Sequence, residues 1–200
     1  MTKWLSESVL EGDSVCLEPM KPTHADALIE AASDGNLWEL WVTTVPSKET
    51  ITDYMEQAFF AKSDGTAMPF VVIEKASGKV IGSTRYCNAA PAHRRVEIGY
   101  TWYSKRYQRT SVNSECKVLL LGHAFEALDA IAVEFRTHIE NKASRTAIAR
   151  LGAVQDGILR QHLIMPNGSI RDTVVFSITR DEWQAVKANL LQKMKKYRDL

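Results

Sequence analysis

Residues 95–128 read RVEIGYTWYSKRYQRTSVNSECKVLLLGHAFEAL, a strand pattern and a helix pattern joined by a polar loop. Apolar and aromatic side chains alternate with others over the first eight residues, which is the period of a β-strand. One predicted face of this strand is Val96, Ile98, Tyr100 and Trp102, and the other is Glu97, Gly99 and Thr101. A long helix is predicted from Asn113 or Ser114 to about Leu128, with Glu115 in its first turn, where negative charge suits the helix dipole.

On both sides of this stretch the sequence alternates further strand and helix patterns. Strands are predicted at residues 15–19, 69–74, 80–86, 133–138, 154–160 and 173–178, and helices at 23–32, from 47 or 48, at 142–151 and from 181. The strand that ends at Pro19 is predicted to lie at a sheet edge, and Thr23 to cap the next helix. This order predicts a mixed α/β sheet, antiparallel in its first half and with a β-α-β crossover in its second.

The composition is typical of one soluble globular domain, and we predict no domain boundary within residues 1–200. Lys and Arg number 25 against 24 for Asp and Glu, the net charge is +1, and 45% of residues are hydrophobic. This balance excludes intrinsic disorder and argues against nucleic-acid binding, which needs a strong positive excess. No run approaches the ~18 apolar residues of a membrane span, and residues 1–7 lack a signal-peptide pattern, so we expect a cytoplasmic protein without membrane contact.

The three cysteines are far apart, and the sequence has neither a Cys-x-x-Cys pair nor a cluster of histidines. We therefore expect no disulfide framework and no metal site. Cys16, Cys87 and Cys116 are predicted to be small buried hydrophobic residues. His123 shares an apolar helix stripe with Cys116, and this position favours a hydrogen-bonded core histidine over a ligand.

The loop Gln108–Asn113 is the first candidate for binding chemistry, because it leads from a strand into a long helix. A helix N-terminus presents unpaired backbone N–H groups and the positive end of the helix dipole, which together can bind an anion. Arg109 adds a positive charge with planar donors, and Thr110, Ser111 and Asn113 add short polar groups. The alternative is a plain helix cap. No Gly-Lys-Ser/Thr motif occurs, which disfavours a nucleoside triphosphatase.

Glu97 is a carboxylate in the middle of an otherwise apolar strand pattern. Burial beside a cleft would raise its pKa toward the range of a general base. The alternative is an exposed position or an ion pair with Arg85 or Arg95. Trp38 and Trp41, in an aromatic loop before the second helix, either line a substrate pocket or cover the core.

Several further segments follow at regular places: ENKASR at 140–145, LGA at 151–153, GILR at 157–160 and RDTVVFSI at 171–178. In order and spacing, these segments and the 96–115 stretch resemble the GNAT superfamily of acetyl-CoA-dependent N-acetyltransferases, over about residues 15–183. The branch most resembled is that of the ribosomal-protein N-terminal acetyltransferases (RimJ/RimL-like). The resemblance implies a three-layer α/β fold, in which a mixed, mostly antiparallel and splayed sheet carries helices on both faces.

The resemblance also implies where acetyl-CoA binds, with its pyrophosphate on the loop and its pantetheine arm on the splayed strand. The residues implied are Ile98, Gly99, Tyr100, Gln108, Arg109, Thr110, Ser111, Val112, Asn113 and Asn141. The family loop pattern is Gln/Arg-x-x-Gly-x-Gly/Ala. Gln108 matches its first position, but Ser111 and Asn113 replace the small residues, so we expect a slightly wider loop.

The resemblance further concerns the acid that protonates the leaving thiolate. Many members use a tyrosine at the position of Ile148, and in the branch resembled here a serine is the proposed substitute, which Ser144 matches. Ser144 is alternatively a first-turn capping residue. We also place the acceptor pocket at Trp38, Trp41 and Arg85.

We therefore expect an enzyme that transfers acetyl from acetyl-CoA to a primary amine, either a small molecule or a protein N-terminus, without a metal. Glu97 is the expected base and Ser144 the residue that assists thiolate departure. The family includes monomers and homodimers. The alternatives are a non-catalytic acyl-CoA-binding or sensing domain and, less favoured, a structural subunit.

Overall fold

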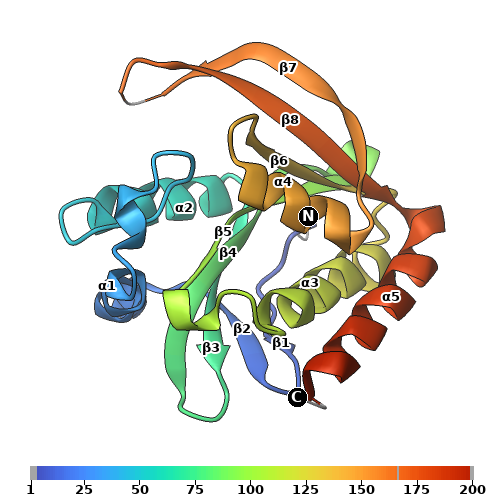
Figure 1. The fold of residues 1–200 in the computed structure, drawn as a ribbon, viewed down its shortest axis with the longest axis horizontal. Helices are drawn as coiled ribbons and strands as arrows, with labels where there is room; N and C mark the ends of the chain where they lie inside the picture. Colours follow the sequence, from blue (N-terminus) through green and yellow to red (C-terminus); the bar gives the residue numbers. More distant parts are fainter. Residues whose placement is uncertain (1–3, 166, 199–200) are drawn as a thin grey trace.

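The computed structural model describes residues 4–165 and 167–198, which contain an eight-stranded sheet with the order β1-β2-β3-β4-β5-β6-β8-β7 (Figure 1). The strands are β1 (Leu10–Glu11), β2 (Val15–Pro19), β3 (Met68–Glu74), β4 (Lys79–Ala90), β5 (Arg95–Tyr103), β6 (Ala132–His138), β7 (Val154–Ile164) and β8 (Ile170–Thr179). The α-helices are α1 (Ala25–Ser33), α2 (Ile51–Ser63), α3 (Val112–Gly122), α4 (Lys142–Leu151) and α5 (Arg180–Arg198).

Helices cover both faces of this sheet, which confirms the predicted three-layer α/β fold. On one face Leu28 of α1 and Met55 of α2 pack with Val71 of β3. On the other face Leu120 of α3 and Trp183 of α5 belong to the larger core cluster. Figure 1 shows α1 and α2 to the left of the sheet, α3 and α5 to the right, and β7 and β8 as a long ribbon across the top.

Strands β5 and β6 separate after a short parallel pairing, whereas the other neighbouring strands are antiparallel. The paired segments are residues 95–97 of β5 and 132–134 of β6. Beyond them β5 continues to Tyr103 and β6 to His138 with no further pairing between the two strands in the described chain. Helix α3 is the crossover between them. The predicted splay is therefore present, and it leaves main-chain groups of β5 without a strand partner on this side.

A bulge at Tyr100 changes the side-chain pattern of β5. Tyr100 has a φ of 52°, and together with Thr101 it lies opposite Thr84 of β4, so two residues face one. As a result Trp102 packs in the core under α1 and α2, whereas Ile98 packs in the core under α3. The strict alternation predicted through Trp102 is therefore wrong, because the extra residue moves later side chains to the opposite face.

Two other local predictions are wrong. The strand β2 is not at the sheet edge, because the short strand β1 pairs with it, with Leu10 opposite Leu17. Thr23 does not cap α1, because it lies inside a 3-10 turn, Pro22–His24, that leads directly into the helix. Single-residue capping and edge positions depend on neighbouring segments that the local pattern does not contain.

The three cysteines are buried and free, as predicted. Within the described residues, no group of three or more His, Cys, Asp and Glu side chains has an arrangement that could hold a metal ion. Among these same residues, every helix is too short or too polar to cross a membrane.

Candidate functional site

The loop that enters α3 binds one N–H group of the first helical turn and leaves others free. The Thr110 hydroxyl donates to the Tyr107 carbonyl at 2.7 Å and accepts from the Val112 N–H, the first of the helix, at 3.3 Å, whereas the side chain of the N-cap residue Ser111 makes no capping hydrogen bond. The N–H groups of a first helical turn have no partner within the helix. For Asn113 and Ser114 no other described backbone group supplies an acceptor. The head of α3 therefore contains one N–H group that a loop side chain binds and further N–H groups that are available to an anion.

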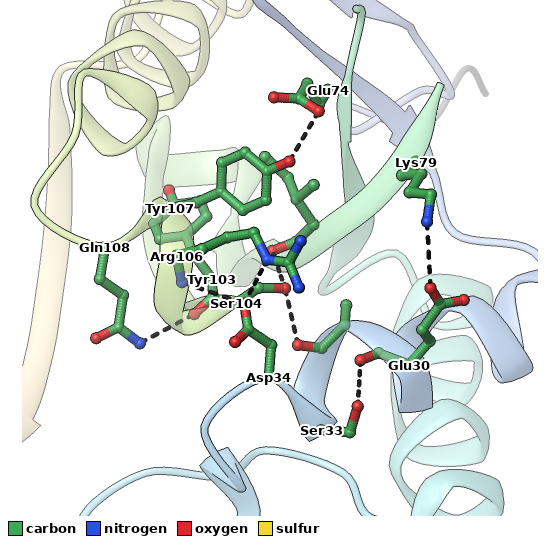
Figure 2. Close-up of polar contacts among 12 residues, drawn as sticks. Glu30, Ser33, Asp34, Glu74, Lys79, Tyr103, Ser104, Arg106, Tyr107 and Gln108 are labelled. Atoms are coloured by element: carbon green, nitrogen blue, oxygen red, sulfur yellow. Dashed lines mark hydrogen bonds and ion pairs between the residues drawn. The ribbon is translucent and has the colours of Figure 1, made fainter. Parts of the chain in front are cut away.

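Contacts with the first half of the chain hold the base of this loop in place (Figure 2). Arg106 donates to Asp34 at the end of α1 through its backbone N–H and its Nε, at 3.1 and 2.8 Å. The Tyr107 hydroxyl donates to a carboxylate of β3 at 2.7 Å, and Gln108 donates from Nε2 to the main chain at the end of β5 at 3.0 Å. Arg109 is exposed, has a φ of 63°, and has no hydrogen-bond or ion-pair partner in the described chain.

Glu97 is 7% exposed and lies in a polar cluster rather than in solvent. Its carboxylate accepts from Nδ2 of Asn88 at 2.7 Å and lies 3.5 Å from Nε of Arg136. Burial raises the pKa of Glu97, and the Asn88 hydrogen bond and the Arg136 charge oppose that rise. The predicted partners Arg85 and Arg95 are wrong, because Arg136 is the paired cation and Arg95 binds a different carboxylate, on β6.

Arg85 lies on β4 directly opposite Gly99 of the splayed strand and is 4% exposed. Its guanidinium carbon is 4.2 Å from the ring centroid of Tyr100 and 5.4 Å from that of Tyr54. Nε and Nη2 of Arg85 are buried and have no hydrogen-bond partner in the described chain. The structure thus places this predicted acceptor residue next to the strand that is expected to hold the cofactor.

Lys117 is a buried residue of this region that the sequence does not single out. Its Nζ donates to Oγ1 of Thr101 on β5 at 3.0 Å and lies 5.7 Å from the ring centroid of Phe135 on β6. The Lys117 amine therefore contacts both of the separated strands, β5 and β6. Its one sequence signal is its position at the start of an otherwise apolar run, residues 116–121. Burial lowers the pKa of Lys117 to about 8.

We expect Lys117→Met to stabilise the protein at pH 7, by about 2–3 kcal/mol. The unfolded lysine keeps its ordinary pKa of 10.5, so between pH 8 and 10.5 the unfolded chain binds more protons, and wild-type stability rises with pH across this window. The Met variant lacks this contribution. Urea unfolding of both proteins at pH 7 and pH 10 measures it, and a variant that is no more stable than wild type at pH 7 would contradict the expectation.

Two predicted site residues lie together at the start of α4. Oδ1 of Asn141 accepts from the Ser144 N–H at 2.9 Å, so Asn141 is the cap of this helix and its amide nitrogen is left for other contacts. Ser144 is half-buried in the first turn, and the capping side chain is therefore not its own. Ile148 is buried in the core one turn later.

The aromatic loop that contains Trp38 and Trp41 extends to the end of β6, the strand that separates from β5. The ring of Trp41 meets that of His138, at the end of β6, edge-on with 5.0 Å between centroids. Trp38 lies in a 3-10 turn, and both tryptophans are exposed and outside the buried core. His123 is hydrogen-bonded rather than free, with its Nδ1 3.4 Å from the Tyr86 hydroxyl, which confirms the prediction for this histidine.

Several known proteins are similar to this chain in sequence and in fold. The family profile described as "Acetyltransferase (GNAT) domain" matches residues 14–154. YdaF of Bacillus subtilis (strain 168), named provisionally as a ribosomal N-acetyltransferase, is 29% identical over 110 residues, 55% of this chain and 59% of YdaF. A crystal structure of a GCN5-related N-acetyltransferase from Brucella melitensis is 30% identical, with a TM-score of 0.84 and coverage of 98% of this chain and 96% of that one. Mycobacterium smegmatis RimJ, in complex with CoA-disulfide, shares the fold at 23% identity and a TM-score of 0.75, with coverage of 94% and 92%.

Proposed function

The chain belongs to the acetyltransferase (GNAT) family, and from this premise we propose that it transfers an acetyl group from acetyl-CoA to a primary amine by direct attack in a ternary complex. Acetyl transfer is the activity of this family, and acetyl-CoA is the donor that the family uses. The likeness to YdaF supports a place in the RimJ/RimL-like branch.

The observation that carries the proposal is the splay of β5 from β6 together with the free donors at the head of α3. A pyrophosphate is an anion suited to these N–H groups and to the unpaired Arg109 guanidinium. The amides of a pantetheine arm match the main chain of residues 98–100, which has no strand partner on the β6 side. Ser111, which replaces a family glycine, has a φ of −67°, so its backbone conformation does not require glycine.

The reaction needs a base, because a free α-amine or lysine has a pKa of ~8 or ~10.4 and is mostly protonated at neutral pH. We assign this role to Glu97, which takes the proton from the ammonium through a water. Main-chain N–H groups of the splayed part of β5 donate to the carbonyl oxygen as its negative charge develops. The Ser144 hydroxyl donates to the departing sulfur, since Ile148 stands where many members have tyrosine.

The acceptor site in this proposal lies between the aromatic loop and β4. Trp41 contacts the end of β6, and Arg85 of β4 lies opposite Gly99 of β5. A primary amine that reaches Glu97 from this side comes from either a small molecule or a protein N-terminus. The name of YdaF favours a ribosomal protein N-terminus as one candidate acceptor.

The test is to incubate the purified protein with acetyl-CoA and a panel of amines and N-terminal peptides, and to follow release of the free thiol. Turnover with any primary amine that depends on both substrates supports the proposal. Tight acetyl-CoA binding without turnover on a broad panel would instead indicate a sensing domain.

A further inference from the structure

Arg85 is a buried cation whose charge no carboxylate of the described chain neutralises. It forms no ion pair, and its Nε and Nη2 lack hydrogen-bond acceptors although the side chain is 4% exposed. A buried donor without an acceptor costs about 1–3 kcal/mol, and more when the group is charged. Such an arrangement is stable only because the surrounding structure enforces it, and it is suited to an anion that arrives from outside.

Aromatic rings hold the guanidinium in place without occupying its N–H groups. The Tyr100 ring lies over it at 4.2 Å, and the Tyr54 ring at 5.4 Å. The Tyr54 hydroxyl is already engaged, since it donates to Oγ of Ser83 at 3.2 Å and lies 3.4 Å from Nε1 of Trp102. The rings therefore fix the planar fork of Arg85, while Nε and Nη2 stay without a partner in the described chain.

The strand register places Arg85 close to the reacting centre. Arg85 pairs with Gly99, and Glu97 precedes Gly99 by two residues, so both side chains lie on one face of the sheet, roughly 7 Å apart along the strand. This spacing matches a small molecule or chain end that presents an amine to Glu97 and an anionic group to Arg85.

The charges around Glu97 point the same way. Arg136 and Arg171 are near enough to Glu97 to lower its pKa, and Arg85 adds a third cation on the same side. The other carboxylate at this position, Glu134, is bound by Arg95 as well as by Arg136. The arginine side chains around Glu97 therefore outnumber the carboxylates that have no ion-pair partner. This excess of positive charge favours an acceptor with negative charge.

We propose that Arg85 binds a carboxylate of the acceptor, so that the preferred acceptor is a primary amine with a carboxylate a few atoms from its nitrogen. The inference rests on the proposed acetyl transfer and specifies its substrate class. The carboxylate has two possible sources: the α-carboxylate of a free amino acid, or the side chain of a chain-terminal Asp or Glu. A carboxylate accepts two parallel N–H bonds from a guanidinium, which an uncharged amide cannot match.

The test compares matched acceptors that differ only in this group: serine with serinamide, and tripeptide amides that begin with Asp or with Asn. Thiol release gives kcat/KM for each, corrected for the fraction of neutral amine. We expect wild type to prefer the acceptor with the carboxylate by about 10- to 100-fold in one of these two comparisons. The comparison that shows the preference identifies the source of the carboxylate. In Arg85→Met the preference should fall to near one. Arg150→Met, which removes a charge from an exposed position of α4, should retain it.

Calorimetric titration of the same acceptors into CoA-saturated protein keeps this test independent of turnover. If no amine is acetylated, the acetyl-transfer proposal fails, while the binding preference still decides the role of Arg85. If wild type shows the same kcat/KM and affinity for the carboxylate and the carboxamide acceptor in both comparisons, the inference is overturned. An unchanged preference in Arg85→Met overturns it as well. If that variant does not fold, the wild-type comparison decides alone, with Arg85→Lys expected to retain only part of the preference.

Discussion

Glu97→Gln should lower kcat about 100-fold or more while leaving the affinity for acetyl-CoA nearly unchanged. Glutamine keeps the size of the side chain and accepts the Asn88 hydrogen bond, but it cannot take a proton from the acceptor ammonium. Steady-state kinetics with a saturating amine and calorimetry with acetyl-CoA separate these two effects.

The pH dependence gives the sharper readout. In the proposed mechanism the ionised form of Glu97 is the active one. Because burial raises the pKa of Glu97, wild-type activity should fall with decreasing pH at a higher pH than for an ordinary carboxyl group. This acid limb should disappear in Glu97→Gln. An acid limb that is the same in variant and wild type would remove Glu97 from the role of base.

Glu134→Gln is the matched control for this experiment. The Glu134 charge raises the pKa of Glu97, so its removal should move the acid limb to lower pH without abolishing it. Since Glu134 also binds Arg95 and Arg136, the folded fraction is checked by thermal unfolding. A loss of activity as large as that of Glu97→Gln would indicate that the neighbouring carboxylates act as a pair.

Arg109→Ala should weaken acetyl-CoA binding about 10- to 100-fold, the range of a charge-assisted hydrogen bond to phosphate. The exposed guanidinium has no hydrogen-bond or ion-pair partner among the described residues, and Arg109 lies in the loop that enters α3, so none of those residues competes with a phosphate for it. Because the position is exposed, the contribution should shrink as salt is added. Calorimetry at low and high ionic strength measures both effects.

Arg106→Ala is the matched control, since Arg106 lies three residues earlier but is bound to Asp34. Its removal should change acetyl-CoA affinity less than Arg109→Ala does. If Arg109→Ala binds acetyl-CoA as tightly as wild type, the pyrophosphate does not bind at this loop.

Much of the fold could be predicted from the sequence because its signals are local. The strand pattern that begins at Arg95 and the helix patterns of residues 113–128 and 142–151 each lie within one segment. The structure has β5 at Arg95–Tyr103, α4 at Lys142–Leu151, and α3 at Val112–Gly122, which a π-helical segment at His123–Ala127 continues. The bulge at Tyr100 was not predictable in this way. Tyr100 is a strand-forming residue, and its φ of 52° comes from its pairing against β4 rather than from its own preference.

The features of the site likewise divide into those that the sequence predicts and those that only the structure identifies. The sequence alone determined that a polar loop with Arg109 precedes a long helix and that Glu97 interrupts an apolar strand, because composition and spacing carry both facts. Only the tertiary structure decided that Arg136, and not Arg85 or Arg95, pairs with Glu97, and that Lys117 lies between the separated strands. Desolvation and ion pairing depend on which side chains from distant parts of the chain meet in space. The periodicity of the sequence does not determine these contacts.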